Sequence, residues 1–472
     1  MIVPRTRLLT WFALLALPFA TLAVALPESA ALTGGLAGLF VLLALLDAVL
    51  GLGALDGLSV ELPKVVRLSK NRPGELPLQV INLSQRQREV RLGLPFPREL
   101  ASAHEDLTAL LPAKAERAKL TWPFQPLKRG NYRLVECYLE AASPLGFWSV
   151  RGITPTDCEV RVYPNLVTER KSVAALFLNR GQFGIHALRQ VGKGRDFEKL
   201  REYVPGDDYG EIHWKATAKR GKPVTKVFQI ERTQEVYVVI DASRLSAREV
   251  TAEASKQCSV FSVQSEKSGA SGDSGLNTEH CLLKTSVLER YLTAALVLGL
   301  AAEQQGDLFG LLTFSDRVQS FVRAKNGKAH YAHCRDALYT LQPQLVSPDF
   351  EELASFLRVR LRRRALVIVL TALDDPLLAE QFERSMELLC RQHLILVNMM
   401  QPPGARPLFS APDVEKVDDV YQRLGGHLLW HRLREMGKSL QHRGVTFNLL
   451  DNERLSAQLV TQYLQVKRRQ LI

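Results

Sequence analysis

Two apolar stretches lie at the start of the chain, and they restrict its fold more than any other feature. The first, Leu8–Leu26, contains no charged residue, and the second, Ala30–Leu50, is interrupted only by Asp47. Because about 20 helical residues cross a hydrocarbon layer of about 30 Å, the pattern predicts a transmembrane helical hairpin over residues 1–57. The alternative is a cleaved signal peptide, because Ala23–Ala25 resembles a cleavage site.

The charges that flank these stretches predict how the hairpin is oriented. Arg5 and Arg7 precede the first stretch, four basic residues follow the second between 64 and 72, and the connector carries only Glu28. Basic flanks stay on the cytoplasmic side, so we expect two spans in the cytoplasmic membrane, in contact with lipid, and a cytoplasmic bulk of the chain. Asp47, near the end of its span, should reach the membrane interface.

Residues 58–165 have the pattern of a small antiparallel β-sandwich. Short runs that alternate apolar and polar residues, such as 76–82, 89–94 and 132–139, are separated by turn sequences that contain Gly, Pro or Asn. Residues 166–231 differ from this pattern, because they are rich in Gly, Arg and Lys and have few long apolar runs. We interpret this second segment as an ordered connector.

Residues 232–472 predict an α/β domain. Continuous apolar runs such as 235–241, 308–314, 365–371 and 393–399 alternate with helical patterns, which is typical of a largely parallel sheet covered by helices. A polar stretch at 255–285, rich in Ser and Gly, interrupts the domain after its first strand. We expect it to be a flexible insertion at the carboxyl edge of the sheet, where such folds bind ligands.

An acidic residue and a hydroxyl stand where the first strand of this domain ends. Asp241 closes the run 235–241, and Ser243 follows two residues later. Two such oxygens at one sheet edge can contribute to a Mg²⁺ site, although Asp241 can equally form hydrogen bonds within its own loop. We expect this edge to be exposed, so that replacing Asp241 would leave the fold nearly intact.

Composition and motifs argue against most enzyme classes. The chain of 472 residues has a formal net charge of +12 and six cysteines, and the cysteines form no zinc-ligand spacing, so we expect reduced thiols. The sequence has no phosphate-binding GxxxxGK[ST], HExxH or GxSxG motif. The pair His427/His431 lacks a third ligand nearby in the sequence, and His330, His333 and Cys334 form an equally weak metal-binding pattern, so we expect structural roles for these residues.

The segment 194–217, here called the hallmark segment, resembles the bacterial family known as domain of unknown function 58. It reads GRDFEKLREYVPGDDYGEIHWKAT, and Pro144–Phe147 and Val162–Leu166 resemble the same family. The resemblance extends over most of the chain, including the two apolar stretches. One departure is Gly210, where the family usually has Arg, so one expected ion pair is absent.

The resemblance implies a von Willebrand factor A-like (Rossmann-type) domain from about residue 232, and a working association with a MoxR-type AAA+ ATPase. We assign partner binding to the hallmark segment, which should also hold the connector against the α/β domain through Trp214 and other side chains. The residues concerned are Tyr203, Gly206, Asp207, Asp208, Trp214 and Lys215.

The same resemblance implies a metal-ion-dependent adhesion site with the pattern DxSxS and a later Thr and Asp. Asp241 and Ser243 match this pattern, but Leu245 replaces the second serine, and Thr371 is followed by Ala372, which leaves Asp374 as the nearest later carboxylate. We therefore expect a degraded site that binds Mg²⁺ weakly if at all.

These observations together predict a membrane-anchored cytoplasmic adaptor or scaffold without catalytic activity, acting with the ATPase in chaperone-like maturation or assembly of other proteins. One alternative is a hydrolase that uses Asp207, Asp208 and His213 for acid–base chemistry. Another is a basic membrane protein that binds nucleic acid, although we expect no nucleic-acid partner because basic and aromatic residues are not interleaved.

Overall fold

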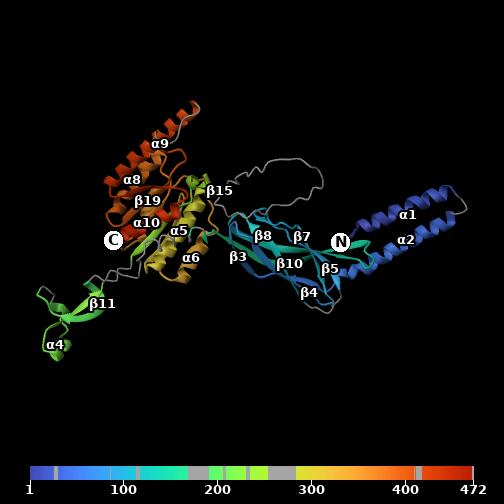
Figure 1. Ribbon diagram of the computed structural model, residues 1–472, viewed down its shortest axis with the longest axis horizontal. Coiled ribbons are helices and arrows are strands. Elements are labelled where there is room, and N and C mark those ends of the chain that lie inside the picture. The colour runs from blue at the N-terminus through green and yellow to red at the C-terminus, as the bar shows by residue number, and fades with distance from the viewer. Residues whose placement is uncertain are drawn as a thin grey trace. The chain divides into compact units, whose positions relative to one another are not determined.

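The computed structural model describes residues 1–25, 30–84, 87–112, 117–167, 169, 191–205, 209–229, 234–252, 283–408, 410 and 417–469. These residues form a multidomain chain with two compact units, Met1–Asn165 and the described residues from Leu166 onward (Figure 1). Each unit is considered separately below.

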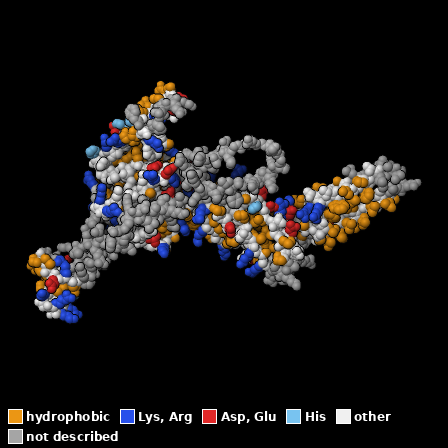
Figure 2. Space-filling view, viewed as in Figure 1, with side chains coloured by type: hydrophobic (Ala, Val, Ile, Leu, Met, Phe, Trp, Pro, Cys, Tyr) orange, Lys and Arg blue, Asp and Glu red, His pale blue; other side chains and the backbone are white. Residues whose placement is uncertain are grey.

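Two helices, α1 (Thr6–Ala25) and α2 (Ala30–Gly51), form the N-terminal part of the first unit and lie side by side (Figure 1). Their surface is largely apolar (Figure 2), and the large side chains exposed on α2 include Leu32, Leu39, Leu42, Leu46 and Val49. A helix that is apolar on all sides is typical of a membrane span. Among the described residues, one helix, Ala31–Leu55, is long and apolar enough to cross a membrane, and Thr6–Leu15 is a shorter apolar helix.

A short strand before the first helix joins the sandwich, which the sequence patterns did not predict. Strand β1 (Ile2–Pro4) pairs antiparallel with β10 (Trp148–Tyr163), in register from Ile2 opposite Val150 to Pro4 opposite Trp148. The amino group of Met1 also donates a hydrogen bond to the carbonyl of Arg151 at 2.9 Å. The chain therefore begins in the sandwich, leaves it through α1 and returns through α2.

Residues 58–163 form two facing sheets, as the alternating runs predicted. One sheet has the order β1-β10-β9-β5-β7 with β3 on β10, and the other has the order β2-β4-β8-β6. The pairs are antiparallel except that β3 lies parallel to β10. The bounds are β2 (Leu58–Glu61), β3 (Val65–Ser69), β4 (Gly74–Asn82), β5 (Arg88–Gly93), β6 (Leu100–Ala101), β7 (Asp106–Leu111), β8 (Arg117–Pro126) and β9 (Gly130–Ala142), after the short 3₁₀ helix η2 (Leu52–Leu55).

One apolar core joins the two sheets. Leu76, Leu78 and Trp122 from one sheet and Leu92 and Val160 from the other are completely or almost completely buried in it. The alternation of buried and exposed residues along β4 and β8 shows why these strands form: their inward side chains pack and their outward ones meet water.

The turn between β9 and β10 binds the end of α2 through Asp47. The Asp47 carboxylate is fully buried, and it accepts hydrogen bonds from Ser143 Oγ (2.6 Å), the Leu145 N–H (2.9 Å) and the Phe147 N–H (3.2 Å). We had expected Asp47 to reach the membrane interface, and this expectation is wrong. Its side chain is buried and accepts hydrogen bonds from a turn of the sandwich. The Pro144–Phe147 sequence noted for the family resemblance forms this turn.

Glycines allow the helix and the turn to approach closely. A Cβ atom on Gly51 at the end of α2 would lie 3.0 Å from the Ser143 Cβ, and Gly146 has a φ of +75°, which L side chains rarely adopt. On the same helix the Ala44 carbonyl accepts a hydrogen bond from the Trp148 indole nitrogen at 2.8 Å. The hairpin and the sandwich are thus joined by specific polar contacts as well as by apolar packing.

The hallmark segment and the residues that follow it, up to Gln229, form a β-hairpin with a short helix between its strands. Strand β11 (Val191–Glu202) pairs antiparallel with β12 (Val224–Gln229), and between them lie the 3₁₀ helix η3 (Tyr209–Glu211) and the helix α4 (Trp214–Arg220). Gly221, in the left-handed conformation, ends α4, and its N–H bonds to the Thr217 carbonyl. Val224 and Thr225 of β12 are buried.

The remaining strands form a six-stranded, mainly parallel sheet with the order β17-β16-β13-β18-β19-β20, in which β17 is an antiparallel edge strand. This is a doubly wound arrangement, in which chain order reverses between β13 and β18. The bounds are β13 (Glu235–Asp241), β16 (Leu308–Phe314), β17 (Val318–Lys325), β18 (Leu366–Leu370), β19 (Leu394–Met400) and β20 (Thr446–Leu450).

Helices cover both faces of this sheet, each over its own apolar core. Helices α5 (Val287–Gln304), α6 (Lys328–Leu338) and α10 (Leu455–Arg468) pack on the face to which Val236, Val238 and Ile240 of β13 point. Helices α7 (Phe350–Arg360), α8 (Pro376–Cys390) and α9 (Val417–His442) pack on the other face, with Tyr237 and Val239. The predicted alternation of strands and helices is therefore present.

A two-stranded sheet brackets the polar insertion. After β13 and the 3₁₀ helix η4 (Arg244–Ala247), β14 (Glu249–Ala252) pairs antiparallel with β15 (Leu283–Ser286), from Glu249 opposite Ser286 to Ala252 opposite Leu283. Ala252 and Leu283, the described residues on either side of the insertion, are therefore neighbours. The insertion was expected to be flexible over residues 255–285, but residues 283–285 belong to strand β15, and the remaining residues, 255–282, lie outside the described residues.

Candidate functional site

Asp241 lies at the point where chain order in the α/β sheet reverses. It is the last residue of β13, and Thr371 directly follows the neighbouring strand β18. Ligand sites of doubly wound sheets form outside the carboxyl ends of the strands at such a reversal. The topology therefore makes the region around Asp241 and Thr371 the candidate site of this domain.

Both carboxylate oxygens of Asp241 accept hydrogen bonds from the protein. The Ser243 N–H donates to Oδ1 at 2.8 Å, and the Thr371 hydroxyl donates to Oδ2 at 2.6 Å. Asp241, Ser243 and Thr371 are all fully buried. The expectation of an exposed strand edge is therefore wrong, because Asp241 joins the loops that follow two adjacent strands.

Burial determines the protonation behaviour of this carboxyl group. Loss of hydration raises the pKa of Asp241 above its ordinary value, and the hydrogen bonds from Thr371 and Ser243 only partly offset that effect. The Tyr291 hydroxyl donates to the Thr371 carbonyl at 3.2 Å and accepts from the Met400 N–H at 3.3 Å. Tyr291 thus connects the loop after β18 with the end of β19.

The residues after Asp241 form a tight turn. Ser243 is the N-cap of η4, and its Oγ accepts a hydrogen bond from the Leu245 N–H at 3.3 Å. The Leu245 side chain is 4% exposed and packs in the core beneath α7 and α8. Leu245, which stands in place of a serine of the adhesion-site pattern, therefore serves packing in this chain.

Asp374 already has a cationic partner. Its Oδ2 lies 2.5 Å from the Arg248 guanidinium, and its Oδ1 is buried with no hydrogen-bond partner in the part of the chain that is described. Arg248 thus neutralises the carboxylate that would otherwise be the later acidic ligand of the pattern.

These contacts do not fit a complete magnesium site. Each carboxylate oxygen of Asp241 already accepts one hydrogen bond, so a divalent cation would have to share an oxygen with Ser243 or Thr371, and one at Asp374 would compete with Arg248. In addition, the described residues contain no group of three or more His, Cys, Asp or Glu side chains that could hold a metal ion.

The hallmark segment presents aromatic side chains on its surface. Trp214 is 71% exposed and Tyr209 is 74% exposed, while Tyr203 stacks on Tyr209 with ring centroids 5.9 Å apart. The expectation of a buried Trp214 that holds the connector is therefore wrong. Lys215 is also exposed, and Gly206, Asp207 and Asp208 lie outside the described residues.

His213, the base of the alternative hydrolase hypothesis, has a structural contact. Its Nδ1 accepts a hydrogen bond from the Ala216 N–H at 3.0 Å, which caps the start of α4. This contact occupies the nitrogen that would otherwise be available as a base on that side of the ring. The acidic partners of the hypothesis, Asp207 and Asp208, are not described.

The other candidate ligands lie in ordinary structural surroundings. His330 Nε2 contacts the Phe309 carbonyl at 2.7 Å and lies 3.5 Å from Cys334 Sγ, and the rings of His427 and His431 are 6.5 Å apart. Burial raises the pKa of the Cys334 thiol to about 12. The described cysteines, Cys137, Cys158, Cys334 and Cys390, are free.

One surface feature was missed by the sequence analysis. The first half of α9 carries Val417, Tyr421, Leu424 and Leu428 at helical spacing, and each side chain is 43% to 71% exposed. The signal was present in the sequence as the spacing i, i+4, i+7, i+11. Two adjacent glycines, Gly425 and Gly426, lower the helix propensity of the same run.

Comparison with known proteins supports the resemblance to domain of unknown function 58. The family described as "Protein of unknown function DUF58" matches residues 199–265 and 277–409, which include part of the hallmark segment and the region around Asp241. No curated protein matches the chain.

Two solved structures of Bacteroides proteins are similar to part of the chain. The conserved hypothetical protein BatB from Bacteroides thetaiotaomicron is 12% identical, with 49% of this chain and 99% of that chain covered and a TM-score of 0.27. An aerotolerance-related membrane protein from Bacteroides fragilis NCTC 9343 is also 12% identical, with 48% and 99% covered and a TM-score of 0.25.

Proposed function

We propose that the protein is a membrane-anchored adaptor, in which α1 and α2 hold the sandwich at the membrane while the hallmark segment and the α/β domain bind other proteins. The observation that carries this proposal is the exposure of Trp214 and Tyr209. Large aromatic side chains on a folded hairpin contribute little to its core when they are this exposed, and they are enriched at protein interfaces.

The position of β1 supports two membrane crossings. Residues 2–4 pair with residues 148–150, so the start of the chain and the sandwich lie on the same side of any membrane that the helices enter. The segment between them can then cross an even number of times, and a single crossing by α2 alone is incompatible with this pairing. Together with the basic flanks, the pairing supports a hairpin whose two ends are cytoplasmic.

The strand order supports a von Willebrand factor A-like domain. The order β17-β16-β13-β18-β19-β20, with one antiparallel edge strand, is that of a doubly wound sheet, and sheets of this kind bind ligands at the strand ends where Asp241 lies. The family resemblance then makes a MoxR-type AAA+ ATPase the partner we propose, in chaperone-like maturation or assembly of other proteins. At Asp241, Mg²⁺ binding is weak if it occurs.

The test compares partner binding with stability in the full-length protein in detergent. Trp214→Ala should weaken binding of the MoxR-type ATPase from the same organism by tenfold or more. It should change the free energy of unfolding by less than about 0.5 kcal/mol, as expected for an exposed residue. Both quantities can be measured on one preparation, by interferometry and by urea unfolding.

Leu377→Ala is the matched control, since Leu377 is also 71% exposed but lies on α8. It should leave both quantities unchanged. The proposal fails if Trp214→Ala binds the ATPase as the wild type does. A large loss of stability in Trp214→Ala would instead restore the structural role that the sequence suggested.

A further inference from the structure

The last strand of the α/β sheet has an open edge. Strand β20 pairs only with β19 among the described residues, in parallel register from Leu396 opposite Thr446 to Met400 opposite Leu450. The Leu450 carbonyl accepts a hydrogen bond from the Gln401 N–H at 2.8 Å, so Leu450 faces β19. Because successive residues of a strand face opposite ways, Phe447 and Leu449 direct their N–H and C=O groups to the open edge.

Two helices turn this edge into a groove of about 780 Å³. Side chains of α9 form one wall, side chains of α10 form the other, and Phe447 and Leu449 of β20 also line the groove. Such a groove has room for an extended backbone beside the strand, where its amides can pair with the outward groups of Phe447 and Leu449, which have no partner in the described part of the chain.

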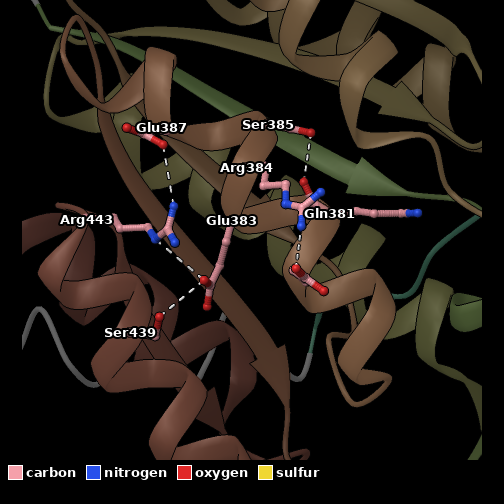
Figure 3. Close-up of polar contacts among 8 residues, drawn as sticks. Gln381, Glu383, Arg384, Ser385, Glu387, Ser439 and Arg443 are labelled. Carbon is pink, nitrogen blue, oxygen red and sulfur yellow. Dashed lines mark hydrogen bonds and ion pairs between the residues drawn. The ribbon is translucent and has the colours of Figure 1, made fainter.

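The walls of the groove are held in place by contacts elsewhere. Arg443 lies 3.5 Å from Glu383 and 3.4 Å from Glu387, and Ser439 donates to Glu383, which fixes the end of α9 against α8 (Figure 3). On the other wall, Lys467 of α10 lies 2.8 Å from the buried carboxylate of Asp307. The groove is therefore preformed, and binding would not need to order its walls.

The charge of the lining indicates which segment would fit. The charged residues that line the groove, Arg434, Lys438 and Arg454, are all basic. The Arg434 guanidinium lies over the Trp430 ring, 5.2 Å from its centroid, which restricts its position. Gln462 also lines the groove, and its Oε1 is buried without a hydrogen-bond partner in the described chain, so it can accept from an incoming N–H group.

We infer that this groove binds an extended acidic segment of a partner protein, which adds to the sheet as a strand beside β20. The inference rests on the proposed adaptor function and assigns a second binding surface to it, on a different part of the chain from the hallmark segment. The free amides of β20 provide affinity for any extended backbone, while the three basic side chains select acidic segments.

The test uses a labelled peptide that alternates Glu and Val, with an otherwise identical Lys/Val peptide as the comparison, and measures fluorescence anisotropy with the full-length protein in detergent. The acidic peptide should bind at least tenfold more tightly. Two methylated forms of the acidic peptide extend the test, one methylated at the backbone nitrogens of the Glu residues and one at those of the Val residues. One form should not bind and the other should bind normally, because only alternate residues of a strand bond to the neighbouring sheet edge.

Two variants of the protein separate the groove from other surfaces. Arg434→Glu/Lys438→Glu should lose at least tenfold in affinity for the acidic peptide, while Arg358→Glu/Arg360→Glu, which changes the net charge equally on the exposed end of α7, should not. Leu449→Pro removes an N–H group that points to the open edge, so it should also abolish peptide binding. The variant should still fold, because proline is tolerated where the N–H does not pair within the sheet.

The inference is overturned if the acidic peptide does not bind, if both charge variants behave alike, or if both methylated peptides bind equally. Trp214→Ala should bind the peptide as the wild type does. A failure of the hallmark surface to bind the ATPase is therefore distinguishable from a failure of the groove.

Discussion

Asp241 carries a carboxyl group that folding removes from water without giving it a cationic partner among the described residues. Its hydrogen bonds come from a backbone N–H and a hydroxyl, which are neutral donors. A buried carboxylate held in this way ionises at a cost, which is why its pKa is raised. The ionised Asp241 side chain therefore reduces the stability of the folded state at neutral pH.

The pH dependence of stability tests this conclusion. Since folding raises the pKa of Asp241, the folded state binds the proton more tightly than the unfolded state, and the wild type loses stability as the pH rises above the ordinary aspartate range. Each unit of such a shift corresponds to about 1.4 kcal/mol. Asp241→Asn lacks this ionisation. Its free energy of unfolding, measured with urea, should therefore rise relative to that of the wild type as the pH is raised from about 3.5 to about 7.5.

The affinity for Mg²⁺ of the wild type and of Asp241→Asn tests the metal site separately. Because Asp241 and Asp374 already have protein partners, we expect a dissociation constant no better than about 1 mM, equivalent to about 4 kcal/mol. Calorimetric titration with Mg²⁺ measures it. Micromolar affinity in the wild type that disappears in Asp241→Asn would contradict our interpretation of Leu245 and Arg248 as incompatible with a complete site.

At the scale of the elements, the contact between α2 and the β9–β10 turn explains how the apolar helices are attached to the sandwich. Asp47 accepts three hydrogen bonds from residues 143–147, which are about 100 positions away in the chain. Apolar packing alone is non-directional, so it would leave the angle of the helix poorly determined. The buried carboxylate instead fixes one register of helix against turn.

Replacing Asp47 should release this contact. Asp47→Ala leaves three donors without an acceptor, one in a buried hydrogen bond and two in part-buried ones. An unsatisfied buried donor costs about 1–3 kcal/mol and a partly exposed donor costs less, so we expect a loss of about 2–5 kcal/mol in the sandwich. Asp56→Ala, at an exposed carboxylate shortly after the helix, should change stability little. Thermal unfolding of the detergent-solubilised protein measures the stability of both variants. Equal effects of the two changes would contradict the assigned role of Asp47.

At the scale of the whole molecule, the chain combines an apolar N-terminal pair of helices, a sandwich and an α/β domain. The first two share a continuous set of contacts, since β1 and the Asp47 turn both attach the helices to the sandwich. In our proposal, the hallmark segment and the groove beside β20 are then displayed by a chain that is fixed at the membrane surface.

Topology mapping tests the anchor. If the proposed two crossings are right, a reporter fused after Ile472 should be cytoplasmic and a tag inserted at Ser29 should be accessible from outside the membrane, since β1 places the start of α1 and the end of α2 on the same side. A Ser29 tag that is protected on the cytoplasmic side would indicate helices that lie on the membrane without crossing it. A C-terminal reporter outside the cytoplasm would contradict the orientation.

Features with a strong periodicity were predictable from the sequence. The apolar stretches gave α1 and α2, the alternating runs gave the strands of the sandwich, and the continuous apolar runs gave the α/β sheet with Asp241 at a strand end. These patterns are local, because each depends on which face of one element avoids water. For the same reason, the patterns predicted helices and strands but not which helices and strands pack or pair with one another.

Only the tertiary structure decided which residues meet across the chain. It placed residues 2–4 in the sandwich, buried Asp47 in a turn about 100 residues away, and paired Asp374 with Arg248. It also left Trp214 exposed, although tryptophan in an ordered segment suggests a core residue. Burial and pairing depend on what other elements cover, and the periodicity of a single segment contains no information about them.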